Sequence, residues 1–551
     1  MHRVNGTVLN SAEHTPVLVV GAGPAGLAAA AELGLHGVAC VVVEPRTEVS
    51  HLRPRAKTTN IRTMEHLRRW GVADALRAAA PLPVAWSQRV TFCESLSGPR
   101  ITDFDNAFGL TAERDDRYAE AGQQVPQPVV EEVLRDRVRG LPSVDLRLGH
   151  AATELVQDDE GVTVTIRDDV GISYLIRARY VLGCDGAGGV VREQIGVRYA
   201  GRSDPRPNFN VVFRAPELDS PLGPAVQYWV VGEQSAGVLG RLDLHGTWWA
   251  ILPGVEADYG VRHADELIAG LVGHRVEHEL VATDTWTARM LVAERFRDRR
   301  VFLVGESAHL NPPWGGHGFN TCVGDAVNIG WKIAAVEHGW APARILDSYE
   351  AERRGVVEQT VRSAETNLSA LANALPKDAE AIQTTKRAEF HSLGLVLGYS
   401  YAGSPIVQPT GPRPRAGDGE VTSYTPTTEP GARLPHRWLP DGSSLYDRLG
   451  AGFTLVGPIR ADQVDRADPA DRADRPGVAV LVERAEQLGV PLTLLEPPPS
   501  DLRREEFLLV RPDQHIAWRA DAVADIDLDL AVGSAQRRPG VPKTKQEADA
   551  A

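Results

Sequence analysis

Residues 17–44 read VLVVGAGPAGLAAAAELGLHGVACVVVE, which is an apolar run, an alanine-rich stretch and a second apolar run. This order is typical of a strand, a helix and a strand. Gly21, Gly23 and Gly26 lie at the first turn, where a backbone without side chains can approach a pyrophosphate at a helix N-terminus. Glu44 ends the second run, where a carboxylate can bond a ribose hydroxyl. The stretch therefore predicts a Rossmann-like dinucleotide-binding domain, although it does not separate FAD from NAD.

The length and charge of the chain limit its class. A chain of 551 residues is too long for one hydrophobic core, so we expect two or three domains. Its 43% hydrophobic and 24% charged residues are typical of a soluble folded protein. A net charge of -14 repels nucleic acid and anionic membranes, so we expect neither as a partner.

The four cysteines lie far apart and lack the spacing of a disulfide framework or of a metal site. They fit a reducing cytoplasm. Residues 1–16 lack the apolar core of a signal peptide. The apolar stretch 17–43 is interrupted by glycines and polar residues, so no membrane-spanning helix is expected. The sequence thus predicts a cytoplasmic protein that binds no metal.

Further elements follow from hydrophobic periodicity and turn residues. Residues 58–69 have helical spacing, with Gly71 as the expected C-terminal cap. Residues 205–255 are β-rich, which favours a sheet that faces the substrate. The other elements expected before residue 400 are strands at 162–166, 174–182, 210–214, 227–231, 247–252 and 301–304, and helices at 128–138 and about 320–338.

A separate α/β unit is expected at the C-terminal end. Residues 401–435 are rich in Pro, Gly and Thr and are typical of a linker. The unit contains no cysteine, which excludes dithiol chemistry and leaves a structural or oligomeric role. Its expected elements are strands at 453–456, 478–482, 507–510 and 516–519, a helix at about 481–487, a solvated loop at 462–475 and a disordered tail from 536.

Two later motifs narrow the cofactor. GCDG at 183–186, with Arg192 shortly after, ends one strand, and GESAH at 305–309, followed by PPWGGHGFN at 312–320, ends another. With the first glycine motif, in this order, they resemble the flavoprotein aromatic hydroxylases of the para-hydroxybenzoate hydroxylase type over residues 15–400. FLLVRPD at 507–513 is similar to the end of the thioredoxin-like domain of phenol and 2,4-dichlorophenol hydroxylases.

The resemblance implies an α/β protein with a Rossmann-like FAD-binding domain, a β-rich substrate domain and a C-terminal thioredoxin-like α/β domain. The FAD-binding domain with its helical extension would span 15–200 and 285–400. The substrate-binding sheet would span 201–284, with 80–110 as a candidate addition. Residues 401–435 would be the linker, 436–535 the thioredoxin-like domain and 536–551 the disordered tail. The expected protein is a monomer or a homodimer.

The resemblance also implies the residues that hold FAD. Glu44 would bond the adenosine ribose, Asp185 would serve both FAD and NAD(P)H, and Glu306 would bond the ribityl chain. Pro313 and the glycines after it would line the isoalloxazine ring, whose negative charge backbone N–H groups at a helix start can stabilise. Pro313 and His317 are the candidate catalytic residues. The full cofactor-binding set is Gly21, Gly23, Ala25, Gly26, Glu44, Arg53, Arg55, Gln127, Asp185, Glu306, Pro313, Gly316, Gly318, Phe319 and Asn320.

Some residues keep two interpretations. The family usually has Asp where this chain has Glu306, so we expect a tolerated variant, with altered flavin geometry or weaker binding as the alternative. His317 is either a flavin or substrate contact or an incidental loop residue, and His309 is expected to pack or bond within the loop rather than act as a base. Trp248 and Trp249, adjacent on a strand, face opposite sides of the sheet. The substrate candidates are Tyr228, Arg241 and Trp248, with core packing as the alternative for each.

The activity that the resemblance implies is an FAD-dependent monooxygenase. It would consume NADH or NADPH and O2 and hydroxylate a phenolic or polyketide-like aromatic substrate through a flavin C4a-hydroperoxide. The flavin performs this chemistry, while the protein positions the substrate and excludes water. The alternatives are Baeyer–Villiger oxidation or epoxidation on the same fold, a flavin dehydrogenase that needs no oxygen, and a non-catalytic flavin-binding protein.

Overall fold

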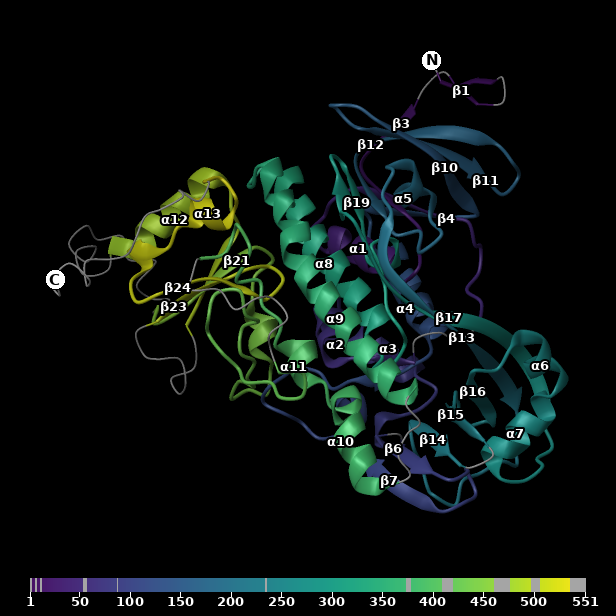
Figure 1. The fold of residues 1–551 in the computed structure, drawn as a ribbon. Helices are drawn as coiled ribbons and strands as arrows, with labels where there is room; N and C mark the ends of the chain where they lie inside the picture. The colour runs from purple at the N-terminus through teal and green to yellow at the C-terminus, as the bar shows by residue number, and fades with distance from the viewer. Residues whose placement is uncertain are drawn as a thin grey trace.

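The computed structural model describes residues 2–4, 7–9, 12–52, 57–86, 88–232, 235–372, 378–408, 420–459, 476–496 and 506–535. Figure 1 shows a large sheet near the N-terminus, a second sheet flanked by α6 and α7, and a C-terminal unit on the other side of α8. The expectations for Arg53, Arg55, residues 462–475 and the tail from 536 lie outside the described residues. Within the described residues, no helix combines the length and the apolar character needed to cross a membrane.

The first sheet is built on the strand, helix and strand predicted from residues 17–44. β3 (Ala12–Val20) leads into α1 (Pro24–Leu35), and β4 (Cys40–Glu44) lies parallel to β3. The sheet order is β10-β11-β12-β3-β4-β9, with β19 (Val301–Leu303) parallel to β12 (Ser173–Gly183). The alanines of α1 are buried, because small side chains let this helix pack closely against α8 (Gly318–Glu337).

One predicted helix begins later than expected. Residues Thr58–Thr59 form β5, which pairs with β8 (Gln123–Gln124), and α2 spans Ile61–Arg69. Asn60 ends the strand and caps the helix, because its side chain accepts a hydrogen bond from the Thr63 N–H at 2.9 Å. Gly71 has a φ of +73°, which confirms the expected left-handed cap.

The other elements of this part include two that were predicted, the helix at 128–138 and the strand at 162–166, and several that were not. They are β1 (His2–Val4), β2 (Thr7–Leu9), α3 (Ala73–Ala79), α4 (Gln127–Arg139), β9 (Val144–Leu148), β10 (His150–Gln157), β11 (Val162–Asp168), α5 (Val190–Gln194), β18 (Arg297–Asp298), α9 (Ser348–Ala372), α10 (Ala379–Phe390), α11 (Leu393–Leu397) and the short 3-10 turns Val84–Trp86, Ala107–Gly109, Gly305–Ser307 and Ala343–Asp347.

The second sheet has the order β20-β17-β13-β16-β15-β14-β6-β7. β6 and β7, which lie within residues 80–110, therefore pair with the strands of residues 199–293. α6 (Ala257–Arg262) and α7 (Ala264–Val272) cover its outer face (Figure 1). The strands are β6 (Val90–Cys93), β7 (Arg100–Phe104), β13 (Tyr199–Arg214), β14 (Gln227–Val231), β15 (Ala236–Arg241), β16 (Thr247–Pro253), β17 (Glu279–Ala293) and β20 (His309–Leu310).

In its described residues, the C-terminal unit is a four-stranded sheet of order β22-β21-β23-β24 with two helices. The strand expected at 478–482 is wrong: these residues lie in α12 (Pro476–Leu488), where the helix formers that follow extend the apolar run as a helix. A strand not expected, β22 (Leu492–Leu495), takes its place. The other elements are 3-10 turns at Leu445–Arg448 and Val523–Asp525, β21 (Phe453–Val456), β23 (Phe507–Val510), β24 (Ile516–Ala520) and α13 (Leu528–Ala531). The α/β fold class is confirmed.

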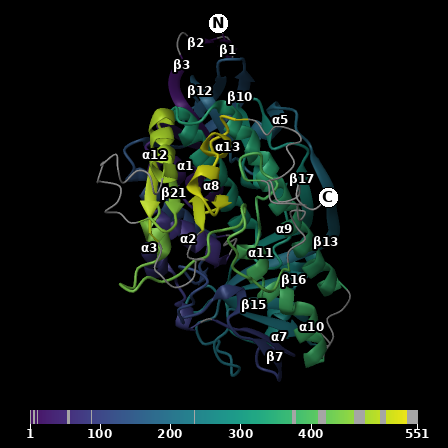
Figure 2. The same ribbon diagram turned by 90° about the vertical axis from the view of Figure 1, so that its left-hand side faces the viewer.

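Buried ion pairs join the C-terminal unit to the helices of the first part. Figure 2 shows β21 and α12 in front of α1 and α8, and the ring of Trp331 on α8 meets Phe453 of β21 at 6.2 Å. Glu352 of α9 accepts hydrogen bonds from both Nη atoms of Arg511, at 2.7 and 2.8 Å. Arg433 pairs with Glu65 of α2 at 2.8 Å. All four charged side chains are buried.

Candidate functional site

A cavity of about 630 Å³ lies at the carboxyl ends of β3, β4 and β12. In doubly wound folds this edge is where nucleotides bind. Eight residues of the predicted cofactor set line it: Gly21, Gly23, Ala25, Glu44, Gln127, Asp185, Glu306 and Phe319. The cavity therefore brings together the glycine turn, the acid after β4 and both later motifs.

Glycine stands at positions 21, 23 and 26 for different structural reasons. Gly21 has a φ of +100°, and a Cβ there would lie 2.6 Å from the Cys184 carbonyl oxygen. A Cβ on Gly26 would lie 1.8 Å from the Gly21 carbonyl oxygen, whereas a Cβ on Gly23 meets nothing within 4 Å. Gly21 and Gly26 thus keep the turn tight, and Gly23 leaves open the space before the N-terminus of α1. This cradle fits a pyrophosphate.

The acid after β4 belongs to a small polar cluster. Glu44 accepts hydrogen bonds from the Ala22 N–H and from Arg46 Nε, both at 2.7 Å. Arg46 also lies 3.4 Å from Glu131, which accepts from Gln127 Nε2 at 2.6 Å. The sequence analysis missed Arg46 and Glu131. Arg46 could have been found from its position, because residues just beyond a strand end face the same crevice as the acid.

The two later motifs bond to each other directly. Asp185 accepts hydrogen bonds from the Val191 N–H at 2.9 Å and from Ser307 Oγ at 3.1 Å. Burial raises the pKa of the Asp185 carboxyl, with these hydrogen bonds acting in the opposite direction. Glu306 is exposed and lines the cavity, and its backbone oxygen accepts from the Tyr199 hydroxyl at 2.5 Å. The Glu306 side chain, which has no hydrogen-bond partner among the described residues, therefore faces the space where a ligand would bind.

The loop at 312–320 is fixed to the segment before α2. Asn320 donates from Nδ2 to the Thr58 and Gly316 carbonyl oxygens, at 3.1 and 2.7 Å, and its Oδ1 accepts from the Asn60 N–H at 2.9 Å. The φ angles of Gly315 and Gly316 are +97° and +69°, conformations that side chains rarely adopt. The loop thus turns sharply and delivers His317 to the N-terminus of α8.

His309, at the other end of this loop region, is bonded within it. Its Nε2 lies 2.7 Å from Asp325 Oδ2, which also accepts from the Gly305 N–H at 3.2 Å. Arg353 of α9 donates to the second oxygen of Asp325 at 2.7 Å. Asp325 therefore connects the loop to both α8 and α9, and His309 is not turned toward either cavity.

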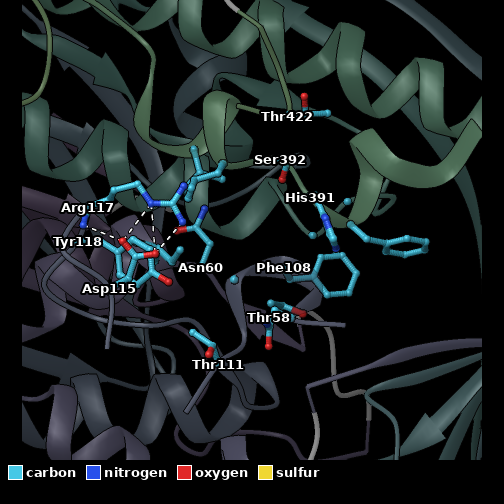
Figure 3. Close-up of a pocket in the computed structure, with 18 of the residues that line it drawn as sticks. Thr58, Asn60, Phe108, Thr111, Asp115, Arg117, Tyr118, His391, Ser392 and Thr422 are labelled. Carbon is cyan, nitrogen blue, oxygen red and sulfur yellow. Dashed lines mark hydrogen bonds and ion pairs between the residues drawn. The ribbon is translucent and has the colours of Figure 1, made fainter. Parts of the chain in front are cut away.

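A second cavity, of about 360 Å³, is lined by Gly315 and Gly316 of the loop at 312–320. Figure 3 shows Thr58, Phe108 and His391 at one end and Asp115, Arg117 and Tyr118 at the other. His317 lines this cavity and is only 4% exposed, and among the described residues its Nε2 has no partner. Burial lowers the pKa of His317 to about 4, so its imidazole is neutral at pH 7.

The structure places the three substrate candidates elsewhere. Tyr228 and Trp248 belong to the outer core under α7, and the Tyr228 hydroxyl donates to the Gly223 carbonyl oxygen at 2.5 Å. Arg241 lies over the Trp248 ring at 4.5 Å. None of the three lines either cavity, because strand alternation turns them to the face away from the glycine loop. The inner face carries Trp249 instead, which confirms that adjacent tryptophans face opposite sides.

Two family models match the chain. An FAD binding domain matches residues 14–364, and the C-terminal domain of aromatic-ring hydroxylases matches residues 427–537. The first match covers all the residues that line the two cavities except Thr422 and those at 390–396. Together the matches span both parts of the fold.

Known proteins are similar over nearly the whole chain. The chain is 31% identical to the 2,4-dichlorophenol 6-monooxygenase of Delftia acidovorans, over 92% of this chain and 95% of that protein. The rebeccamycin biosynthetic enzyme RebC with reduced flavin has a TM-score of 0.82 and 29% identity, and covers 96% of this chain and 100% of its own. Aklavinone-11 hydroxylase with FAD and aklavinone has a TM-score of 0.79 and 29% identity, over 96% and 98%.

These matches settle the cofactor and the class of enzyme. The cofactor is FAD, and a monooxygenase of this kind takes its electrons from a reduced nicotinamide and its oxygen from O2. The chain therefore belongs to the FAD-dependent aromatic-ring hydroxylases, a family of flavin monooxygenases.

Proposed function

We propose that this enzyme hydroxylates a phenolic or polyketide-like aromatic substrate in the cavity beside residues 315–317. The observation that carries the proposal is the lining of that cavity. Phe108 and Phe390 meet edge to face at 5.4 Å and offer an apolar wall to an aromatic ring, and the loop with His317 also lines the cavity. A volume of about 360 Å³ suits a small aromatic ligand.

The larger cavity supplies the contacts that we propose for FAD. The turn with Gly21, Gly23 and Ala25 would bind the pyrophosphate, with Gly26 packed behind it. Glu44 and Gln127 would hold the adenosine half. The remaining proposed contacts are Asp185 and Glu306 on the central part of the cofactor, and Pro313, Gly316, Gly318, Phe319 and Asn320 around the ring. Arg53 and Arg55 keep their predicted roles outside the described residues.

Bound FAD supplies the redox chemistry, in which a nicotinamide hydride is accepted and O2 is activated. The chain's own residues provide the surroundings. The start of α8, a helix of 20 residues, presents backbone N–H groups that favour negative charge on a neighbouring ring. Pro313 would support that ring. His317, neutral at pH 7, would hold a substrate hydroxyl by a hydrogen bond rather than by charge.

The domain boundaries expected from the sequence remain our proposal, with β6 and β7 added to the substrate sheet through their pairing with β14. We also keep the predictions of a cytoplasmic enzyme, monomeric or homodimeric, with no nucleic-acid, membrane or metal partner. Baeyer–Villiger oxidation and epoxidation are the competing reactions, because they use the same cofactor and the same oxygen. A non-catalytic flavin-binding protein would keep the cradle without turnover.

Labelled oxygen tests the proposal. The purified FAD-loaded enzyme is incubated with NADH or NADPH, ¹⁸O2 and a panel of phenols and hydroxylated polycyclic aromatics. We expect one labelled oxygen in a new ring hydroxyl, with consumption of the nicotinamide that depends on the substrate. A ring-expanded ester or an epoxide would assign the competing reactions, and turnover without label in any product would refute oxygenation. Replacing His317 with Ala should weaken substrate binding without loss of FAD.

A further inference from the structure

The ammonium group of Lys57 lies next to the inner face of the substrate sheet and has no counter-ion among the residues that the structure describes. Of the six lysines in the chain, the structure describes three. Lys332 pairs with Glu352 and Lys386 with Glu389, each at 2.7 Å. For Lys57, in contrast, the described part of the chain offers neither an ion-pair partner nor a hydrogen-bond acceptor. Burial lowers the pKa of Lys57 to about 8, since no carboxylate compensates the lost water.

The side chain of Lys57 ends on an aromatic face. Its Nζ lies 3.9 Å from the centre of the Trp249 ring, within the range of a cation–π contact. Trp249 is 3% exposed, and among the described residues its Nε1 has no acceptor. A Cβ on Gly240, the cross-strand neighbour, would lie 3.0 Å from that Nε1, so the glycine leaves the N–H edge uncovered. The half-buried ammonium of Lys57 and the buried N–H of Trp249 thus lie together without an acceptor among the described residues.

Hydrogen bonds to the backbone hold Lys57 next to the loop at 312–320. Its carbonyl oxygen accepts from the Val125 N–H at 2.8 Å, and the next residue, Thr58, is held by Asn320. Lys57 thus connects the segment held by the loop at 315–320 to the substrate sheet, and it directly precedes Thr58, which lines the second cavity, although Lys57 and Trp249 are not among the lining residues of that cavity. A positive charge without a counter-ion among the described residues favours an anionic ligand next to that cavity.

We propose that Lys57 and the Trp249 N–H bind an anionic oxygen on the aromatic substrate, a ring phenolate or a ring carboxylate. This inference rests on the proposed function and adds the charge state of the substrate. A phenolate is also the more electron-rich form of a phenol, so a site that binds it prepares the ring for oxygenation. Lys57 is a specificity-determining residue in this proposal, and Trp249 shares the contact.

Paired ligands test the proposal by calorimetry with the FAD-loaded enzyme. The probes are 2,4,6-trichlorophenol with 2,4,6-trichloroanisole, and 2,4-dichlorobenzoate with its methyl ester. At a pH where the phenol is ionised but Lys57 is still charged, we expect at least one anion to bind about 10- to 100-fold more tightly than its neutral partner. The pair that shows the difference identifies phenolate or carboxylate.

Variants locate the contact. Lys57→Met should abolish the preference for the anion, and Lys57→Arg should keep most of it. Trp249→Phe removes the N–H and should weaken anion binding about 2- to 10-fold, whereas Trp248→Phe, on the opposite face of the same strand, should leave it unchanged. FAD content and thermal unfolding confirm that each variant is folded.

Three results would overturn the proposal. They are no anion binding by the wild type, an anion preference that survives in Lys57→Met, and an effect of Lys57→Met confined to FAD affinity or to the flavin reduction potential. The third result would indicate that the Lys57 ammonium interacts with FAD and not with the substrate. Oxygenation of the neutral anisole by both wild type and Lys57→Met would leave the proposed function intact while refuting this inference, so the two failures are distinguishable.

Discussion

Replacing Arg511 with Met should destabilise the protein strongly, because this arginine neutralises two buried acids. Arg511 is fully buried and donates two hydrogen bonds to Glu352 and two to Asp513, at 2.6 to 3.1 Å. Lys332 is the only other cation that pairs with Glu352 among the described residues, at 2.7 Å. Two carboxylates and two cations thus balance in the wild type, and one carboxylate is left over in the variant.

Removing one partner of a buried ion pair costs about 3–5 kcal/mol. We expect a loss of this size for Arg511→Met, measured by urea denaturation of the FAD-loaded protein followed by circular dichroism. Arg511→Lys keeps the positive charge but loses the forked geometry of the guanidinium, so its free energy of unfolding should lie between those of the wild type and Arg511→Met. The double variant Arg511→Met with Glu352→Gln should recover part of the loss, because the uncompensated charge is then gone.

Arg484→Met is the matched control, because Arg484 pairs with Asp529 on the surface of the same unit. Its denaturation midpoint should equal that of the wild type. The reasoning is refuted if Arg511→Met and Arg484→Met unfold at the same urea concentration. It is also refuted if the double variant is less stable than Arg511→Met, since this would assign the loss to packing and not to charge.

Three further predictions concern the cofactor site. Gly26→Ala should destabilise the apoprotein and abolish FAD binding, because its Cβ would lie 1.8 Å from the Gly21 carbonyl oxygen. Gly23→Ala should leave the stability of the apoprotein unchanged and weaken only FAD binding, because its Cβ meets nothing within 4 Å. Flavin fluorescence measures FAD binding and thermal unfolding measures stability, so together they separate the two effects. His317→Gln should reduce the loss of stability in acid. In the folded wild type the pKa of His317 is about 4, below the ordinary value of 6.5, so the unfolded state binds more protons between these two values. The wild type therefore loses about 2 kcal/mol of unfolding free energy from this group between pH 7 and pH 5. Equal slopes of unfolding free energy against pH for wild type and His317→Gln would contradict this. Glu306→Asp, which restores the usual family residue, should change the Kd for FAD by less than about tenfold, since the carboxylate faces an open cavity; a larger gain in affinity would favour the alternative of a weakened site.

The sequence predicted the cofactor half of the molecule well, because its constraints are local. The glycine turn, the following helix and the acid after β4 lie within 28 residues, and backbone sterics dictate where glycine is needed. Local signals also explain the errors. The β-branched run at 478–482 suits a strand or a helix, and only the helix formers after it decide. Asn60 caps α2, and the predicted start at Thr58 is too early because the apolar spacing begins only at Ile61.

The substrate side was predicted poorly for a different reason. Alternation along β16 shows that Trp248 and Trp249 face opposite sides, but it does not say which side meets the cofactor. The second cavity joins segments near residues 58, 108, 317 and 391, which are distant in sequence. No local pattern marks such a convergence. Lys57 likewise attracts no attention in the sequence, since its missing partner is visible only in three dimensions.

The buried ion pairs between the two ends of the chain also set an order of assembly. During synthesis the N-terminal part of a protein emerges and folds first. Glu352 is made 159 residues before Arg511, and Glu65 is made 368 residues before Arg433. Until these arginines leave the ribosome, Glu352 on α9 and Glu65 on α2 have only Lys332 and Arg62 as ion-pair partners among the described residues. The last part of the chain is thus the part that closes the flavin-binding scaffold, and a prematurely terminated polypeptide lacks the two arginines that complete these buried ion pairs.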